Sequence, residues 1–221
     1  MGLFSRKKKE NKIPRGFYTV SIKELRHLTE DAVQVVLDIP GDLIDKFTFI
    51  PGQYLNFSIT LNGEEHRRSY SICSSAQDQN KAQQLQVGIK RIDGGVFSNY
   101  ANQALKKGMT LEVMPPQGHF YTELDPQQQK QYLFMAVGSG ITPNLSHIRT
   151  ILATEPKAKV TLLYGNKSTP LMMFREKLCF IKNQYMNRFE CKYDLGSQLY
   201  QMCRRQSSRQ NQCRHHLGQS N

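Results

Sequence analysis

Short runs of alternating hydrophobic and polar residues dominate the first half of the chain. Six such runs, with turn signals between several of them, predict short β-strands at residues 17–23, 32–39, 54–61, 67–73, 85–91 and 110–114. Asn62 and Gly63 separate the third run from the fourth, and both tolerate the positive φ angles of a tight hairpin turn. The pattern predicts a six-stranded antiparallel barrel within residues 14–125.

A single helix is expected inside this first region. Apolar side chains recur at helical spacing from Phe97 to Leu105 and form one hydrophobic stripe. Lys106 and Lys107 suit the negative end of a helix dipole, and Gly108 can cap the last turn. The helix is therefore predicted to end close to Gly108.

The pattern changes over residues 130–190. A continuous apolar run from Tyr132 to Val137 precedes a Gly-Ser-Gly turn, and a second apolar run extends from Lys159 to Tyr164. Pro143 suits the first helical position of the segment between them, whose buried face consists of Leu145, Ile148 and Leu152. This order predicts a strand–helix–strand unit with two parallel, buried strands.

Composition and charge narrow the class of protein. The 221 residues are 38% hydrophobic, which is enough for a core, and the formal net charge is +12. Residues 1–13 form a basic tail, and residues 191–221 form a basic, polar tail with six Gln and four Ser but no Val, Ile, Ala or Phe. We expect residues 191–221 to be disordered, and we expect no nucleic-acid binding because no aromatic-and-basic motif accompanies the charge.

No long apolar segment or secretory signal is visible in the sequence. The apolar runs are far shorter than the ~20 residues that cross a bilayer, so we expect a cytoplasmic protein without a membrane partner. The five cysteines are an odd number and are expected to be free thiols. Their spacing matches neither a zinc site nor an iron–sulfur cluster, so no metal site is predicted; the four late ones are Cys179, Cys191, Cys203 and Cys213.

The segment Arg68-Ser69-Tyr70-Ser71 carries the most informative chemistry. Arg68 and Tyr70 share one face of a strand, where a guanidinium can bind phosphate oxygens beside a flat ring on which a flavin can stack. Ser71 can offer a hydroxyl to a ring nitrogen. A half-buried strand with a surface arginine is the competing interpretation of these residues.

A second candidate is Gly94-Gly95-Val96-Phe97-Ser98, at the start of the predicted helix. The free N–H groups of a helix N-terminus bind pyrophosphate, the glycines allow close approach, and Ser98 adds a hydroxyl donor. A plain loop with a helix cap is the alternative.

A third candidate, Gly138-Ser139-Gly140-Ile141-Thr142-Pro143, lies between a buried strand and a helix, where doubly wound sheets bind nucleotide phosphates. Pro143 replaces the third glycine of the usual dinucleotide fingerprint. After the next strand come Asn166 and Lys167, with no acid to bind a ribose 2′-hydroxyl. Lys167 suits a 2′-phosphate, which favours NADPH over NADH; a surface lysine in a turn remains the alternative.

These motifs in this order resemble the ferredoxin–NADP reductase superfamily, and the likeness covers roughly residues 16–190. Phe49-Ile50-Pro51-Gly52-Gln53-Tyr54 and Pro116-Gln117-Gly118-His119-Phe120 also match the family's barrel. Within it, the chain is similar to the reductase subunits of ring-1,2-phenylacetyl-CoA epoxidase, which serve phenylacetate catabolism. The segments that carry this likeness are Arg67–Cys73, Gly108–Met114 and Tyr164-Gly165-Asn166 before Met172-Met173-Phe174-Arg175.

The resemblance implies a fold and a set of roles. The fold is an antiparallel FAD-binding barrel followed by an incomplete Rossmann-like parallel α/β NADP-binding domain and a disordered tail. Arg68 and the group Gly95, Val96 and Ser98 would bind the FAD pyrophosphate, while Tyr70 would pack on the isoalloxazine and Ser71 would lie near flavin N5. The NADPH site would be lined by Gly138, Gly140 and Thr142.

The resemblance also implies a reaction and a partner. Hydride would pass from NADPH to FAD, and single electrons would then pass through an iron–sulfur centre to an oxygenase component. Family members of this type add a 2Fe-2S domain that this sequence lacks. We interpret the chain as the product of a frameshifted or truncated gene, with residues 191–221 read out of frame. The second half should then expose apolar surface, and FAD binding should survive while NADPH turnover is impaired. A flavin-binding fragment without reductase activity, and a basic interaction protein, are the alternatives.

Overall fold

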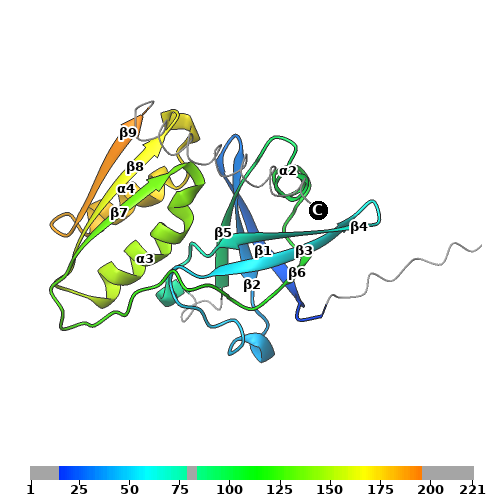
Figure 1. Cartoon of the computed structure of the whole chain (residues 1–221), viewed down its shortest axis with the longest axis horizontal. Coiled ribbons are helices and arrows are strands. Elements are labelled where there is room, and N and C mark those ends of the chain that lie inside the picture. Colours follow the sequence, from blue (N-terminus) through cyan, green and yellow to red (C-terminus); the bar gives the residue numbers. More distant parts are fainter. Residues whose placement is uncertain (1–14, 79–83, 196–221) are drawn as a thin grey trace, which may run out of the picture.

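The computed structural model describes residues 15–78 and 84–195 and contains two sheets, which lie side by side in Figure 1. The first unit comprises strands β1–β6 with helix α2, and the second unit comprises strands β7–β9 with helices α3 and α4. Each unit has its own cluster of buried apolar side chains.

The first unit is a six-stranded antiparallel sheet in the order β4-β3-β6-β1-β2-β5, which confirms the predicted strands. Its strands are β1 (Tyr18–Thr29), β2 (Ala32–Asp38), β3 (Tyr54–Leu61), β4 (Glu64–Ser71), β5 (Gln84–Lys90) and β6 (Thr110–Val113), with a short 3-10 helix η1 (Gly41–Leu43) after β2. Asn62 and Gly63, at φ 52° and 88°, form the expected two-residue hairpin turn. Among the described residues, the two edges of this curled sheet meet at one isolated bridge, Ile72–Val87, so the barrel is not closed by a full ladder.

Strand β2 is buried on both faces because it lies between the two units. Val33, Val35 and Leu37 point into the core of the first unit. Ala32 belongs to the hydrophobic cluster of the second unit, and the buried Gln34 donates to Gln86 Oε1 at 2.8 Å. The sequence pattern of β2 therefore reflects two packing surfaces.

Helix α2 (Val96–Gln103) places Phe97 and Ala101 in the core, as the apolar stripe predicts. It ends at Gln103, earlier than expected. Gly108 is not its cap, because the Gly108 N–H donates to Ile22 O at 2.8 Å in the turn that leads into β6.

The second unit is a parallel sheet in the order β7-β8-β9, which confirms the strand–helix–strand prediction and extends it. Its elements are β7 (Gln131–Val137), the 3-10 turn η2 (Gly138–Gly140), α3 (Ile141–Thr154), β8 (Lys159–Asn166), the 3-10 turn η3 (Thr169–Leu171), α4 (Arg175–Gln184) and β9 (Phe189–Leu195). Pro143 is the third residue of α3 rather than the first, still within the turn whose N–H groups have no helical acceptor.

Strand β9 corrects the expected start of the polar tail at residue 191. Cys191 pairs with Leu162 of β8, and the ladder continues to Leu195 opposite Asn166. Two buried side chains, Phe189 and Cys191, suffice to hold this edge strand because its backbone bonds to β8 supply the rest. Residues 196–221, where the remainder of the expected tail falls, lie outside the described residues.

One face of the parallel sheet is bare in the part of the chain that the structure describes. Helices α3 and α4 pack with Val160, Leu162 and Phe189 in one cluster, on a single face. On the other face, Leu133 and Met135 are each 64% exposed. Within the described residues this agrees with the expected exposure of apolar surface in the second half, while its attribution to truncation stays a prediction. None of the described helices combines the length and hydropathy needed to span a membrane.

Candidate functional site

Strand β4 presents a free guanidinium beside an aromatic ring. Arg67 is held by two hydrogen bonds to Glu65, from Nε to Oε1 at 2.7 Å and from Nη2 to Oε2 at 3.0 Å. Arg68, its neighbour, has no acidic partner among the described residues, and its Nη1 donates only to the Arg67 carbonyl at 2.6 Å. The exposed Arg68 side chain can therefore bind an anion without first breaking an ion pair.

The Tyr70 ring connects the end of β4 to the start of α2. Its centroid lies 5.5 Å from that of Phe97, the second residue of α2, and 5.9 Å from that of Phe57. Burial raises the pKa of Tyr70 to about 12, although the positive charge of Arg68 opposes this shift. The phenol therefore stays protonated at neutral pH and can donate a hydrogen bond.

The N-terminus of α2 lies next to this strand end, so the structure brings these two predicted segments together. Gly94 is exposed, Gly95 is the N-cap residue and Val96 is 40% exposed. Ser98 differs from its prediction in orientation. It is 4% exposed, and its Oγ accepts the Ile92 N–H at 3.2 Å and contacts Gly95 O at 3.3 Å, so the hydroxyl shapes the loop from inside.

The Gly138–Gly140 turn joins β7 to α3 and is fixed by side chains that the sequence did not single out. Tyr164, fully buried, donates its hydroxyl hydrogen to Gly138 O at 3.0 Å. The Asn144 Nδ2 group donates to Met135 O at 3.0 Å and to Gly140 O at 3.3 Å. The predicted residue Thr142 donates from Oγ1 to Ser139 O at 3.0 Å. Tyr164 carried no sequence signal beyond its place in an apolar strand.

A cavity of about 290 Å³ adjoins this turn. Asn166 and Lys167 from the second unit line it together with residues of the first, and the full lining is Asp31, Lys90, Arg91, Asp93, Gly138, Asn166, Lys167 and Leu171. Asn166 is 1% exposed, and its amide lies near enough to the Tyr164 hydroxyl to oppose the raised pKa of that phenol, but Nδ2 meets no acceptor at ordinary hydrogen-bond distance among the described residues. A buried donor without an acceptor is costly unless a ligand supplies one.

This donor set fits part of a nucleotide. Lys167 is exposed and forms no ion pair in the described structure, while Lys90 lies 3.3 Å from Asp31. Sequence reasoning missed Lys90 and Arg91; the basic pair directly before the Gly94 loop was the available signal. The described residues contain no group of three or more His, Cys, Asp or Glu side chains placed to hold a metal.

The two candidate segments approach each other across β5. Ser71 is followed by Ile72, which bridges Val87. The next residue of β5, Gly88, packs so closely on the second unit that an added Cβ would lie 2.9 Å from Thr142 Cγ2. The end of β4 and the Gly138–Thr142 turn are therefore neighbours of the same short stretch of β5.

The fold is a two-unit arrangement of an antiparallel, barrel-like sheet followed by a parallel α/β unit with a glycine-containing turn, and comparison with known proteins agrees with it. Residues 19–121 match the oxidoreductase FAD-binding domain, and residues 134–216 match the oxidoreductase NAD-binding domain. The second match extends past residue 190. In this order and on this fold, the two domains show that the chain belongs to the ferredoxin–NADP reductase superfamily of FAD- and NAD(P)-binding oxidoreductases.

Two curated relatives are a subunit of an epoxidase and a ferredoxin reductase component of a monooxygenase. The chain is 42% identical over 174 residues to one subunit of the 1,2-phenylacetyl-CoA epoxidase of Escherichia coli (strain K12), and the match covers 79% of this chain and 48% of that protein. It is 31% identical over 179 residues to the ferredoxin reductase component of the 3-ketosteroid-9-alpha-monooxygenase of Rhodococcus rhodochrous, covering 80% of this chain and 49% of the relative. The chain thus spans about half the length of these relatives.

Solved structures share the fold. A cytochrome P450 reductase of Amycolatopsis superposes with a TM-score of 0.69 at 21% identity, covering 83% of this chain and 54% of that one. A ferredoxin-NADP+ reductase of Plasmodium falciparum has a TM-score of 0.68 at 19% identity, covering 80% of this chain and 72% of that one.

Proposed function

We propose that the chain is an FAD-dependent oxidoreductase that accepts hydride from NADPH and passes electrons to the oxygenase component of a multicomponent monooxygenase. One observation carries the proposal. Tyr70, which shares a face of β4 with the free Arg68 side chain, contacts Phe97 in the first turn of α2. This supports a pyrophosphate site between Arg68 and the N-terminus of that helix. The similarity to an epoxidase subunit and to a ferredoxin reductase component of a monooxygenase supports the choice of electron acceptor.

We assign the flavin to residues 14–125 and the nucleotide to the unit that begins at residue 130. Arg68 and the N–H groups at Gly95 and Val96 would bind the FAD pyrophosphate, with Gly94 allowing close approach. Tyr70 would pack on the isoalloxazine ring, and Ser71 would lie near its N5 atom. When bound, FAD supplies the two-electron chemistry that takes hydride from NADPH and releases single electrons.

The second unit would orient NADPH. Its turn, Gly138-Ser139-Gly140, with Thr142 and Pro143 in the first turn of α3, would face the nicotinamide half of the nucleotide. Asn166 would donate its unpaired Nδ2 hydrogens to the ligand, and Lys167 would bind the 2′-phosphate. This last contact is the basis for NADPH over NADH.

A visible spectrum of the purified chain tests the flavin site. Bound FAD should be retained by the wild type, and Arg68→Ala should weaken its affinity by about 10- to 100-fold, because a charged hydrogen bond contributes about 1.5–3 kcal/mol. Arg67→Ala is the matched control, since this adjacent arginine is already paired with Glu65. Equal FAD affinity in the two variants would contradict the assignment of Arg68.

Rapid mixing with NADPH tests the reaction. Loss of the flavin absorption band reports hydride transfer, and Lys167→Ala should reduce the preference for NADPH over NADH. Lys159→Ala, at the opposite end of β8, is the control for charge. A flavin-loaded chain that NADPH does not bleach would exclude the reductase function.

A flavin-holding fragment without reductase activity is the second candidate. The bare sheet face at Leu133 and Met135 favours it, because a loosely packed second unit would bind NADPH poorly. On the same basis we propose that turnover is impaired relative to the longer relatives while FAD binding is preserved. The bleaching experiment separates the two candidates.

A further inference from the structure

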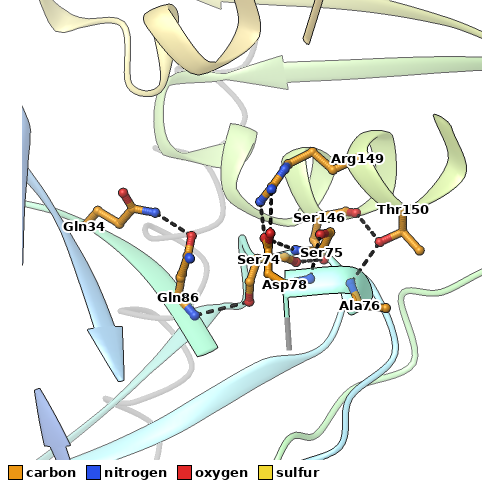
Figure 2. A network of polar contacts seen from close by, with 9 residues as sticks. All are labelled: Gln34, Ser74, Ser75, Ala76, Asp78, Gln86, Ser146, Arg149 and Thr150. Carbon is orange, nitrogen blue, oxygen red and sulfur yellow. Dashed lines mark hydrogen bonds and ion pairs between the residues drawn. The ribbon is translucent and has the colours of Figure 1, made fainter. Parts of the chain in front are cut away.

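A polar network joins the first unit to helix α3 of the second (Figure 2). On one side is the segment Ser74–Asp78, which is separated from the end of β4 by Ile72 and Cys73. On the other side are Ser146, Arg149 and Thr150 of α3. We name these contacts the interunit clasp, made by Ser74, Ala76, Asp78, Ser146, Arg149 and Thr150.

The buried part of the clasp consists of neutral hydrogen bonds. Ser146 donates from Oγ to Ser74 O at 2.6 Å, and both residues are fully buried. The Ala76 N–H donates to Thr150 Oγ1 at 3.3 Å, and that hydroxyl in turn donates to Ser146 O at 2.9 Å. Because α3 is bound at successive turns, the clasp fixes its rotation as well as its distance from the first unit.

The outer part of the clasp is a two-point ion pair. Arg149 binds the Asp78 carboxylate through both Nη atoms, with Nη2 at 2.8 Å from Oδ1. The side chains are 18% and 26% exposed. Burial alone would raise the pKa of the Asp78 carboxyl, but the hydrogen bonds and charge of Arg149 outweigh it and the pKa lies below its ordinary value.

The segment Ser74–Asp78 is itself anchored in the first unit. The Cys73 N–H donates to Gln86 O at 2.8 Å, and the Gln86 N–H donates to Ser74 Oγ at 3.2 Å. The Ser75 N–H donates to Asp78 Oδ2 at 3.0 Å. The start of the segment is therefore attached to β5, and Asp78 is held to Ser75.

The clasp binds the two segments that carry the candidate cofactor sites. Arg68, Tyr70 and Ser71 lie in β4, which ends two residues before Ser74–Asp78. The Gly138–Gly140 turn immediately precedes α3. Any rotation of α3 about the clasp would move this turn relative to Ser71, and a displacement of about 1 Å at a reacting centre can slow a reaction by about a hundredfold.

We propose that the interunit clasp sets the distance and angle between the flavin-binding end of β4 and the nucleotide-binding turn, with Asp78, Arg149 and Ser146 as positioning residues for hydride transfer. The proposal rests on the proposed reductase function. None of the three residues need touch either cofactor for this role, because they act through β4 and α3. Their loss should therefore lower the rate of the hydride step more than the affinity for either ligand.

The test uses Asp78→Asn and Ser146→Ala in the full chain loaded with FAD. Glu24→Gln is the matched control, since Glu24 forms a similar two-point pair with Arg26 inside the first unit, at 2.6 and 2.5 Å. Asp78→Glu keeps the charge and serves as the conservative variant. Ser146→Ala removes a single hydrogen bond, so it remains informative if Asp78→Asn does not fold.

The first measurement is flavin reduction over a range of NADPH concentrations. The limiting rate should fall by about tenfold or more in Asp78→Asn and Ser146→Ala, with FAD content and half-saturating NADPH nearly unchanged. Asp78→Glu should recover most of the rate, and Glu24→Gln should match the wild type. A limiting rate that is unchanged, or that falls equally in Glu24→Gln, would overturn the proposal.

The second measurement is amide hydrogen exchange, which does not depend on turnover. Loss of the clasp should speed exchange in residues 141–154 but not in residues 18–29. If the wild type holds FAD and NADPH does not reduce it, the proposed reductase function fails and this measurement alone decides. Unchanged exchange in α3 of both clasp variants would then refute the clasp.

Discussion

Gly52 offers a sharp test of how the loop before β3 packs against the rest of the molecule. A Cβ added at this position would lie 1.6 Å from Phe120 O and 2.5 Å from His147 Nε2. The backbone is at φ +98°, where side chains are strained. The carbonyl of Phe120 accepts a hydrogen bond from His147 Nε2 at 2.9 Å, so Gly52→Ala must displace the acceptor, the donor or both.

The magnitude follows from a comparison with Gly108. Gly108 is also at positive φ, +86°, but an added Cβ there would meet nothing within 4 Å. Gly108→Ala should therefore cost only the backbone strain, about 1–2 kcal/mol. Gly52→Ala adds a lost hydrogen bond of about 1 kcal/mol and overpacking of about 1–3 kcal/mol. It should destabilise the protein by about 2–4 kcal/mol more than Gly108→Ala.

Urea unfolding followed by circular dichroism measures the difference. With a slope of about 2 kcal/mol per molar urea, the midpoint of Gly52→Ala should lie about 1–2 M below that of Gly108→Ala. The two slopes should agree, which confirms that stability rather than compactness has changed. Midpoints that coincide would show that the Phe120 carbonyl moves freely, and the packing argument would then be wrong.

Three further predictions concern the second unit, its bare face and the clasp. Tyr132→Phe deletes the phenol hydrogen bond to Glu155, and Tyr164→Phe deletes the one to Gly138 O together with a longer contact to Met173 O, so each should lower the free energy of unfolding by about 1–2 kcal/mol. Only Tyr164→Phe should also weaken NADPH binding, by about three- to tenfold, because only Tyr164 holds Gly138; equal NADPH affinities by titration would refute this. Leu133→Lys with Met135→Lys should change stability by less than about 1 kcal/mol and reduce aggregation measured by light scattering, and unchanged scattering would count against the bare face. The pKa of the Asp78 carboxyl is lowered in the folded protein, so its contribution to stability is present above the ordinary carboxyl pKa, about 3.9, and is lost as the pH falls through the folded value. Asp78→Asn should therefore lose less stability with acid than the wild type, measured by urea unfolding at several pH values. Parallel pH curves for the two proteins would contradict this.

The strands and the hairpin could be predicted because their signals are local. Alternation over a few residues and a turn pair such as Asn62-Gly63 fix the local backbone whatever surrounds it, and the observed boundaries of β2, β3 and β6 differ from the predicted ones by at most one residue. The end of α2 could not be predicted in the same way. Gly108 is drawn into a turn by the carbonyl of Ile22, more than eighty positions away in the chain, and no local pattern reports that bond.

The candidate site also combines features set by local sequence with features set by contacts between distant residues. Arg68 and Tyr70 were predictable because alternation alone places them on one face. The inward orientation of the Ser98 hydroxyl depends on its hydrogen bond from the Ile92 N–H. Whether Asn166 Nδ2 has an acceptor depends on which groups of other elements lie near it. Such properties belong to the assembled molecule, so the motif identifies the segment and the fold decides which of its atoms face a ligand.

Strand β9 forms where amino-acid composition predicts disorder, because its pairing register with β8 places apolar side chains on one face. A polar segment was expected to stay disordered because it buries too little apolar area to offset its ordering entropy. An edge strand beside a formed neighbour escapes that limit, since only one of its faces needs apolar side chains. Phe189 and Cys191 fill that face while Glu190 and Lys192 alternate outward, and the backbone pairs with β8 at each step. The start of this strand is thus decided by the alternation of Phe189 and Cys191 opposite Val160 and Leu162, rather than by the composition of residues 191–221.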